Sequence, residues 1–169
     1  MNVKIIYWPK SGSVEKVAKK IADKLNNANV FSVENIDYNM LADTELLILG
    51  GSTVGADDWK NSNYKDAWSK FFNELNQKGL SLKNKKVAIF GLGNQVLYPE
   101  HFVDSMKDMA DYVEATGASI VGASENKGYH FTASEALKDG KFIGLAIDED
   151  TQASKTDARI DAWIADLGL

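Results

Sequence analysis

The 169-residue sequence contains no cysteine, and this absence excludes several kinds of chemistry. Without thiols the chain has no disulfide, no thiolate-bound zinc or iron–sulfur cluster, and no cysteine nucleophile. Histidine is almost as rare, and the two present, His101 and His130, lack the spacing of metal ligands. The Gly-x-Ser-x-Gly pattern is also missing, and Ser11 and Ser13 have no companion His or Asp pattern. We therefore expect no metal site and no catalytic residue of these types.

Long apolar runs and an excess of positive charge are absent as well. No run approaches the ~20 apolar residues of a membrane span, and residues 2–8 are typical of a strand and not of a signal peptide. A formal net charge of −5 argues against nucleic-acid binding, which needs clustered Lys and Arg. The composition, 44% hydrophobic and 25% charged, is ordinary for a soluble globular protein. We expect a cytoplasmic monomer, one domain over residues 1–169, that binds neither membrane nor nucleic acid.

Residues 4–18 carry the strongest signal that is present. An apolar run long enough for a buried strand ends at Pro9, and apolar residues then recur at i, i+3 and i+4 from Val14, which predicts a helix over about 12–26. A strand that enters a helix through a short Ser/Gly turn directs free backbone N–H groups and the positive end of the helix dipole into one small space. That space suits a phosphate group. We interpret the turn as the phosphate end of a nucleotide-like cofactor site.

Strands and helices alternate along the whole chain. The pattern predicts strands over 2–8, 29–33, 46–51, 85–90, 119–122 and 142–147, and helices over 12–26, 64–77, 102–115 and 156–167. Such alternation is typical of an α/β fold, a doubly wound parallel sheet with helices on both faces. A polar and aromatic stretch, 124–141, separates the last two strands.

Three polar or Gly-rich loops follow predicted strands, at residues 8–14, 51–64 and 91–100. Because the carboxyl ends of parallel strands lie along one edge of a sheet, we expect these loops to form one site. The loop 51–64 is long for a strand-to-helix connection, and long loops in compact domains are often functional.

The sequence resembles the flavodoxins, specifically their long-chain group. The segments that carry the resemblance are Gly91-Leu92-Gly93-Asn94-Gln95 with Tyr98, Gly128-Tyr129-His130-Phe131 followed by Ala133-Ser134, and Phe142-Ile143-Gly144-Leu145-Ala146-Ile147-Asp148-Glu149-Asp150. The resemblance covers nearly the whole chain. It implies a flavodoxin-like five-stranded sheet in the order 2-1-3-4-5, with the fifth strand split by an insertion at 124–141. It also implies noncovalently bound FMN and a low-potential carrier that shuttles single electrons between redox enzymes.

In the first loop, the family pattern at the FMN phosphate is hydroxyl–x–Thr–Gly–x–Thr. The resemblance assigns this role to Lys10, Ser11, Gly12, Ser13 and Val14. Pro9 and Val14 stand where two hydroxyls are expected, and each lost hydrogen bond to a charged acceptor is worth roughly 1.5–3 kcal/mol. Lys10 either offsets part of this loss with an ammonium beside the phosphate or is a solvated loop charge.

The second loop matches the segment that covers one face of the flavin. Its candidate contacts are Ser52, Thr53, Val54 and Gly55. A tryptophan is common at the position of Val54, so Trp59 either replaces it as a stacking platform or packs beneath the loop. At Gly55 the resemblance implies a peptide that reorients on reduction, since glycine tolerates φ > 0; a plain turn glycine is the alternative.

The third loop supplies Gly91, Gly93, Asn94 and Tyr98. The resemblance implies that Tyr98 stacks on the other flavin face, which gains roughly 0.5–1.5 kcal/mol beyond area burial. The family usually has Asp where Asn94 stands. Asn94 still offers its amide oxygen to the flavin but removes a negative charge, which predicts a less negative second reduction potential than in typical relatives. Residues 148–150 are expected to cap the last helix.

These features favour an electron carrier over an enzyme. The partners that the resemblance implies are a flavodoxin reductase and an oxidoreductase of pyruvate type. Two alternatives stay open: an interaction module whose altered phosphate loop has weakened or lost FMN binding, and an FMN-dependent quinone reductase.

Overall fold

The structure, a computed structural model, describes residues 1–26, 28–52 and 63–169. Within this part of the chain, one parallel sheet has the order β2-β1-β3-β4-β5, and a further strand, β9, also pairs with β4. Its strands are β1 (Val3–Tyr7), β2 (Asn29–Ser32), β3 (Leu46–Ser52), β4 (Lys86–Leu92), β5 (Ser119–Val121) and β9 (Leu145–Ile147). The order and the parallel direction confirm the predicted doubly wound sheet.

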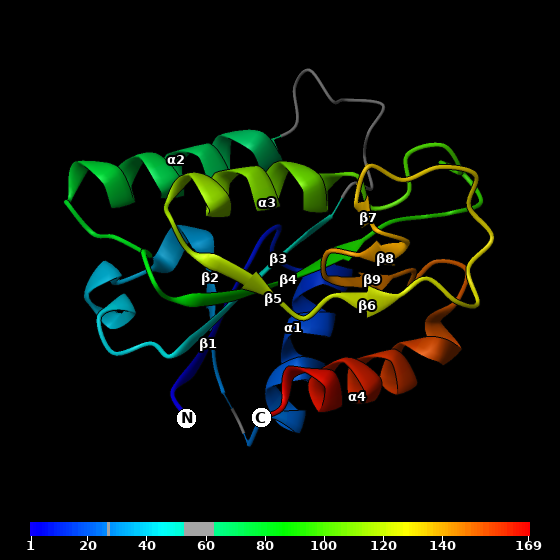
Figure 1. Ribbon diagram of the computed structural model, residues 1–169, viewed down its shortest axis with the longest axis horizontal. Coiled ribbons are helices and arrows are strands. Elements are labelled where there is room, and N and C mark those ends of the chain that lie inside the picture. Colours follow the sequence, from blue (N-terminus) through cyan, green and yellow to red (C-terminus); the bar gives the residue numbers. More distant parts are fainter. Residues whose placement is uncertain (27, 53–62) are drawn as a thin grey trace.

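Helices cover both faces of this sheet (Figure 1). In the view of Figure 1, α2 (Asn63–Gln77) and α3 (Ser105–Ala115) lie above the sheet, and α1 (Ser13–Lys24) and α4 (Thr156–Leu167) lie below it. Short 3-10 turns, η1 (Val33–Asn35), η2 (Tyr38–Leu41) and η4 (Ala153–Lys155), occur in the connections. The predicted helices are confirmed, although α3 begins at Ser105 and not at Phe102.

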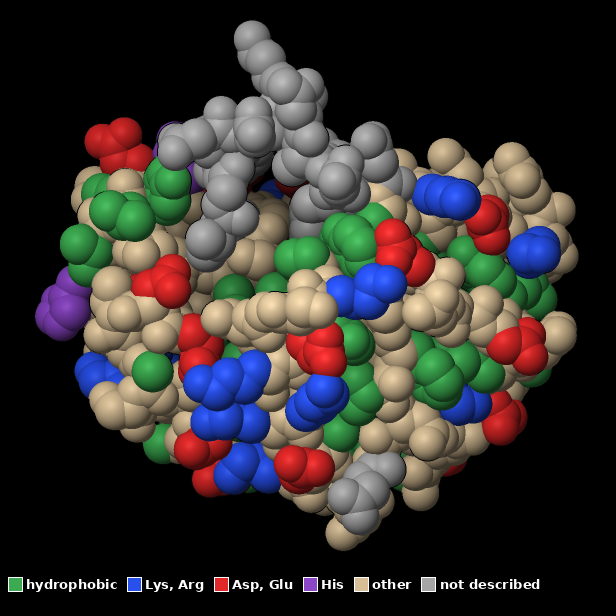
Figure 2. All heavy atoms as spheres, turned by 180° about the vertical axis from the view of Figure 1, so that it is seen from behind, with side chains coloured by type: hydrophobic (Ala, Val, Ile, Leu, Met, Phe, Trp, Pro, Cys, Tyr) green, Lys and Arg blue, Asp and Glu red, His purple; other side chains and the backbone are tan. Residues whose placement is uncertain are grey.

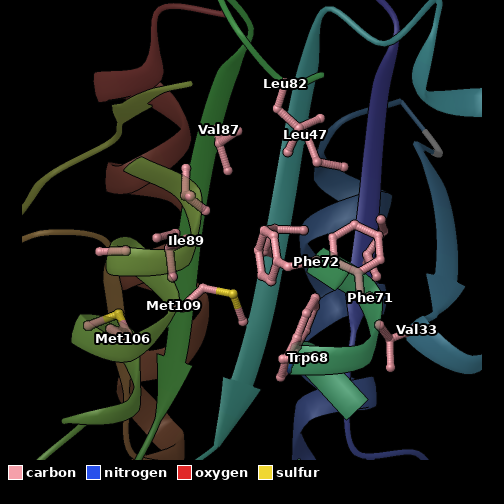
Figure 3. Close-up of a cluster of buried hydrophobic side chains, with 14 of the residues drawn as sticks. Val33, Leu47, Trp68, Phe71, Phe72, Leu82, Val87, Ile89, Met106 and Met109 are labelled. Atoms are coloured by element: carbon pink, nitrogen blue, oxygen red, sulfur yellow. The ribbon is translucent and has the colours of Figure 1, made fainter. Parts of the chain in front are cut away.

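Each face of the sheet has its own hydrophobic core. Above it, the rings of Phe71 and Phe72 of α2 lie edge to face, with 5.0 Å between the ring centres. Both rings pack against apolar side chains of β3, β4 and α3 (Figure 3). Below it, Val17, Ile21 and Trp163 pack against the same two strands. β3 is buried on both sides because it lies between the two layers, which explains its continuous apolar run.

The fifth strand is split, as the resemblance implied. Ala88 of β4 pairs with Val121 of β5, whereas Phe90 pairs with Leu145 of β9, two residues further along β4. The intervening segment contains a small antiparallel sheet of β6 (Ser124–Glu125), β7 (Leu137–Lys138) and β8 (Lys141–Phe142).

The single strand predicted over 142–147 is therefore wrong in detail. Its first residue belongs to the antiparallel β8, and its last three form the parallel β9. Between them Gly144 passes close to the main sheet: a Cβ atom there would lie 2.2 Å from the carbonyl oxygen of Ile89. The chain changes its pairing partner at this glycine.

Candidate functional site

The carboxyl ends of four strands are aligned at one edge of the sheet. Ser52, Leu92 and Ile147, the last residues of β3, β4 and β9, pair side by side, and Tyr7, the last residue of β1, pairs with Gly50 two residues before the end of β3. We call the loops that leave this edge, residues 8–14, 93–98 and 148–152 together with the end of β3, the rim. The first and third predicted loops both leave this edge, as expected. Ser52 ends β3, but Thr53, Val54, Gly55 and Trp59 lie outside the described residues.

The first rim loop offers an exposed turn at the amino end of α1. The predicted phosphate-binding residues Lys10, Ser11, Gly12 and Ser13 are all exposed. The first bond of the helix runs from the Lys16 N–H to the Gly12 carbonyl (3.1 Å), so the N–H groups just after Gly12 have no acceptor within the helix. A Cβ at Gly12 would meet no atom within 4 Å, so there is open space beside it. These features fit a phosphate group.

Val14 contributes to this loop only through its backbone. Its side chain is buried in the core below the sheet. Lys10 forms an ion pair with Glu34 (Nζ to Oε2, 2.6 Å). The sequence suggested either a phosphate ligand or a solvated loop charge, and neither suggestion included this ion pair.

Glu15, in the first turn of α1, binds this loop and was not among the predicted site residues. Its Oε2 accepts a hydrogen bond from the Ser11 N–H (2.8 Å), and its Oε1 accepts one from Lys19. Hydrogen bonds from Lys19, from the Ser11 N–H and from the Tyr7 hydroxyl lower the pKa of Glu15 to about 2. Burial, and then the hydrogen bond to Glu15, raise the pKa of Tyr7. One N–H of the phosphate loop therefore already faces a carboxylate within the chain. In the sequence, the one sign of this contact is that Glu15 lies four residues after Ser11.

The glycines of the third loop are required by packing. A Cβ at Gly91, which lies within β4, would be 2.4 Å from the Cγ of Met106 on α3. A Cβ at Gly93 would be 3.0 Å from the backbone nitrogen of Val103. Tyr98 is half-buried, and its N–H donates to the Asn94 carbonyl (2.9 Å).

The amide of Asn94 is oriented by its neighbours. Its Oδ1 accepts from the N–H groups of Val96 (3.0 Å) and Leu97 (2.9 Å), so this oxygen holds the turn of the third loop. Its Nδ2 donates to Oδ2 of Asp150 (3.3 Å). The amide nitrogen thus points to a carboxylate of the neighbouring rim loop, and the contact of the amide oxygen with a flavin stays a prediction.

Asp148 joins the third rim loop to the chain after β9. Its side chain is fully buried, and its carboxylate accepts from both nitrogens of Gln95 (backbone 3.1 Å, Nε2 2.8 Å), from Thr151 and from the Asp150 N–H (3.1 Å). Burial opposes ionisation, but the hydrogen bonds from Thr151 and Gln95 outweigh it and hold the pKa of Asp148 below its ordinary value.

The expectation that residues 148–150 cap the last helix is corrected by this geometry. Asp148 caps the turn at 150–151, whereas α4 begins only at Thr156. Gln95 in turn accepts from the His130 N–H (2.5 Å), which ties the insertion to the rim. Neither Asp148 nor Gln95 was a predicted site residue. Their positions after a strand could have suggested a role at the site, since Asp148 follows an apolar run and Gln95 follows Asn94 in the Gly-rich motif.

The sheet is open and has helices on both faces, and its strand-end loops and one helix N-terminus lie at the same edge. This arrangement is typical of nucleotide-binding α/β proteins. The sequence model of the flavodoxin family, described as Flavodoxin, matches residues 5–163. The flavodoxin of Klebsiella pneumoniae is 36% identical, over 98% of this chain and 96% of that protein. A flavodoxin of Nostoc sp. is 33% identical, over 98% and 95%. The crystal structure of Fusobacterium nucleatum flavodoxin bound to flavin mononucleotide superimposes with a TM-score of 0.81 at 28% identity, covering 98% of this chain and 96% of that one.

The chain belongs to the flavodoxin family. Flavodoxins are FMN-dependent electron carriers and not enzymes, so the predicted class of protein and the predicted cofactor are confirmed at the level of the family. In the described part of the chain, no helix combines the length and the apolarity needed to cross a membrane.

Proposed function

We propose that this chain binds FMN noncovalently at the rim and carries single electrons between redox proteins. The observation that carries the proposal is the alignment of four strand ends around the open turn at the amino end of α1. The FMN-bound flavodoxin of Fusobacterium nucleatum, which shares the fold, supports it. Bound FMN supplies the electron-transfer chemistry, and the protein binds the cofactor, orients it and adjusts its potential.

Different residues hold the phosphate end and the flavin end of the cofactor. The backbone N–H groups that follow Gly12, with the hydroxyls of Ser11 and Ser13, hold the phosphate. The ring of Tyr98 covers one face of the flavin. The candidates on the other face are Ser52, Thr53, Val54 and Gly55. Gly91 and Gly93 act indirectly, because they let the third loop approach α3 closely.

The partners that suit such a carrier are a flavodoxin reductase and an oxidoreductase of pyruvate type. A net charge of −5 favours docking on basic surfaces of these partners. We propose further that the protein is cytoplasmic and acts as a monomer, a single domain over residues 1–169.

Titration of the purified protein with FMN tests the proposal. We expect a yellow one-to-one complex that is reduced in two separate one-electron steps. A colourless protein that ignores added FMN would support the interaction module in place of the carrier. Fast two-electron turnover with a quinone would support the quinone reductase.

A further inference from the structure

Arg159 is the single arginine of the sequence, and its charge has no carboxylate in contact with it. The side chain is half-buried on α4, and within the described part of the chain no Asp or Glu oxygen lies within 4.0 Å of its guanidinium. Its Nη1 is buried and has no hydrogen-bond acceptor among the described residues. Burial lowers the pKa of Arg159, and Tyr129 and Asp148 counteract this only in part. A cation in such surroundings favours the binding of an anion.

Three hydrogen-bond donors meet at one acceptor beside this guanidinium. The Gly128 carbonyl accepts from Nε2 of Gln152 (2.9 Å), Nζ of Lys155 (3.2 Å) and Nη2 of Arg159 (3.2 Å). A carbonyl oxygen has two lone pairs, and two of these three donors carry a positive charge. Like Arg159, Lys155 forms no ion pair with any residue in the described ranges. Donors therefore exceed acceptors at this point.

The guanidinium is held in place from two sides. It lies 3.8 Å from the centre of the Tyr129 ring, whose hydroxyl donates to the Ala146 carbonyl (2.7 Å). Its Nη2 also donates to Oε1 of Gln152 (2.7 Å). A ligand that binds here finds the cation already ordered, which lowers the entropic cost of binding.

A pocket of about 460 Å³ lies beside these donors, between the insertion and α4. Strand β6 and helix α4, which border it, lie one above the other in Figure 1. Its walls combine cations and apolar side chains: Lys127, Lys155, Arg159, Leu145, Ala162 and Trp163. The volume is within the range of sites for small molecules. Among the described residues that line it, none belongs to the rim.

Two carboxylates also line the pocket, but they leave its Gly128 end positive. Glu125 is paired with Lys141 (2.6 Å), which lies outside the lining, and is 3.8 Å from Lys127. Asp166 lies about two turns beyond Arg159 along α4. Neither carboxylate therefore neutralises the pair of cations at the Gly128 carbonyl.

We propose that this pocket binds a small organic anion, with an oxyanion head (phosphate or carboxylate) on an apolar body. The head lies at Lys155 and Arg159, because a guanidinium and an ammonium are strong donors to such oxygens. The body lies along Leu145 and Trp163. This is a second ligand site, and it does not rest on the proposed function because it uses no residue of the rim.

The single arginine provides a local probe. It gives one side-chain Nε–H signal in a nitrogen–proton correlation NMR spectrum, so this signal reports on the pocket alone. The protein, with one equivalent of FMN, is titrated with phenyl phosphate, benzoate and inorganic phosphate. We expect phenyl phosphate to shift the signal to saturation and inorganic phosphate, which has no apolar body to bury, to bind about tenfold more weakly.

Benzoate distinguishes the two kinds of head. A saturable shift with benzoate and phenyl phosphate indicates a site for either oxyanion, and a shift with phenyl phosphate alone indicates a phosphate site. The absence of a saturable shift with both organic anions would overturn the inference. A chain that does not bind FMN would refute the proposed function and leave this test intact, because the Arg159 signal still reports on the pocket.

Variants measured by calorimetry test the two parts of the pocket. Arg159→Gln should weaken the binding of phenyl phosphate about tenfold or more. Lys155→Gln, at an exposed position, should weaken it too and tests the head site even if Arg159→Gln does not fold. Ala162→Leu, also at an exposed position, narrows the apolar part, so it should weaken phenyl phosphate and leave inorganic phosphate unchanged.

Lys107→Gln is the matched control. It removes one positive charge from α3, outside this pocket, and should leave the affinity for phenyl phosphate unchanged. Equal losses in Lys107→Gln and in Arg159→Gln or Lys155→Gln would show general attraction between charges and overturn the inference.

Discussion

Among single residues, Glu15 changes the interpretation of the phosphate loop most. The pattern of hydroxyls and glycine predicted where the loop lies. It did not show which of the backbone N–H groups there are free to bind a phosphate. The structure gives the Ser11 N–H to Glu15 and leaves those after Gly12 for a ligand. Ser11 has a φ of +64°, and no sequence pattern reveals this backbone conformation or the contact with Glu15.

The substitution Glu15→Gln should strengthen FMN binding about threefold to tenfold, because it removes a negative charge near the phosphate. The glutamine oxygen can still accept from the Ser11 N–H, so the loop keeps its shape. Riboflavin, which lacks the phosphate, is the control ligand, and its affinity should not change. Fluorescence titrations with both flavins measure the effect. Equal changes for the two flavins, or weaker FMN binding, would contradict the prediction.

Asp148 makes the rim sensitive to acid. Because the pKa of Asp148 is held below its ordinary value of about 3.9, its ionised form stabilises the folded state above that pH. This contribution is lost as the pH falls through the lower, folded-state pKa. Asp148→Asn should lower the free energy of unfolding by about 1–3 kcal/mol at pH 7 and by less at pH 3. Denaturant titrations at the two pH values measure the difference; an equal loss at both would show that charge is not involved.

At the scale of elements, hydrophobic periodicity predicted the order and the type of the main helices and strands. It failed over 142–147, because a run of apolar residues does not say which strand it will pair with. The change of partner at Gly144 is set by its close approach to Ile89 in a distant strand. At Gly91 the structure shows a close contact between β4 and α3, which the sequence did not reveal, and its place in the cofactor site stays a prediction.

Close contact between β3 and β4 predicts a strong effect at Gly50. A Cβ there would lie 1.9 Å from the Cζ of Phe90, whose ring is buried in the lower core. Gly50→Ala should lower the free energy of unfolding by about 1–3 kcal/mol or more through overpacking. Gly12→Ala is the control, because its Cβ would meet open space at an ordinary φ of −146°, so only the smaller cost of alanine at an N-cap is expected. Comparable losses in both variants would disprove the steric explanation.

For the whole molecule, oppositely charged side chains join its first and last helices. Lys20 pairs with Asp157 (3.0 Å) and Lys24 with Asp161 (2.5 Å), and charges of both signs alternate over this side of the protein (Figure 2). Exposed pairs of this kind contribute typically 0.2–1 kcal/mol each, so they add little to the stability of the fold.

The insertion is attached at several points. The Gly128 carbonyl accepts from Gln152 (2.9 Å), Lys155 (3.2 Å) and Arg159 (3.2 Å), and the Arg159 guanidinium lies 3.8 Å from the centre of the Tyr129 ring. The resemblance to long-chain flavodoxins located this segment. Its contacts could not be predicted, because each joins residues far apart in the sequence.

The split fifth strand has a consequence for shortening the chain. Since Val121 pairs with Ala88 and Leu145 with Phe90, one residue alone is needed opposite Ile89 to make the two halves continuous, and Gly144 is available for that place. Deletion of residues 122–143 should therefore yield a truncated protein with an unbroken outer strand. It should lose about 3–5 kcal/mol with the buried Phe142, and bind FMN less tightly without the link from His130 to Gln95. Circular dichroism, unfolding and FMN titration of this variant would show whether the sheet folds without the segment; an unfolded product would show that it does not.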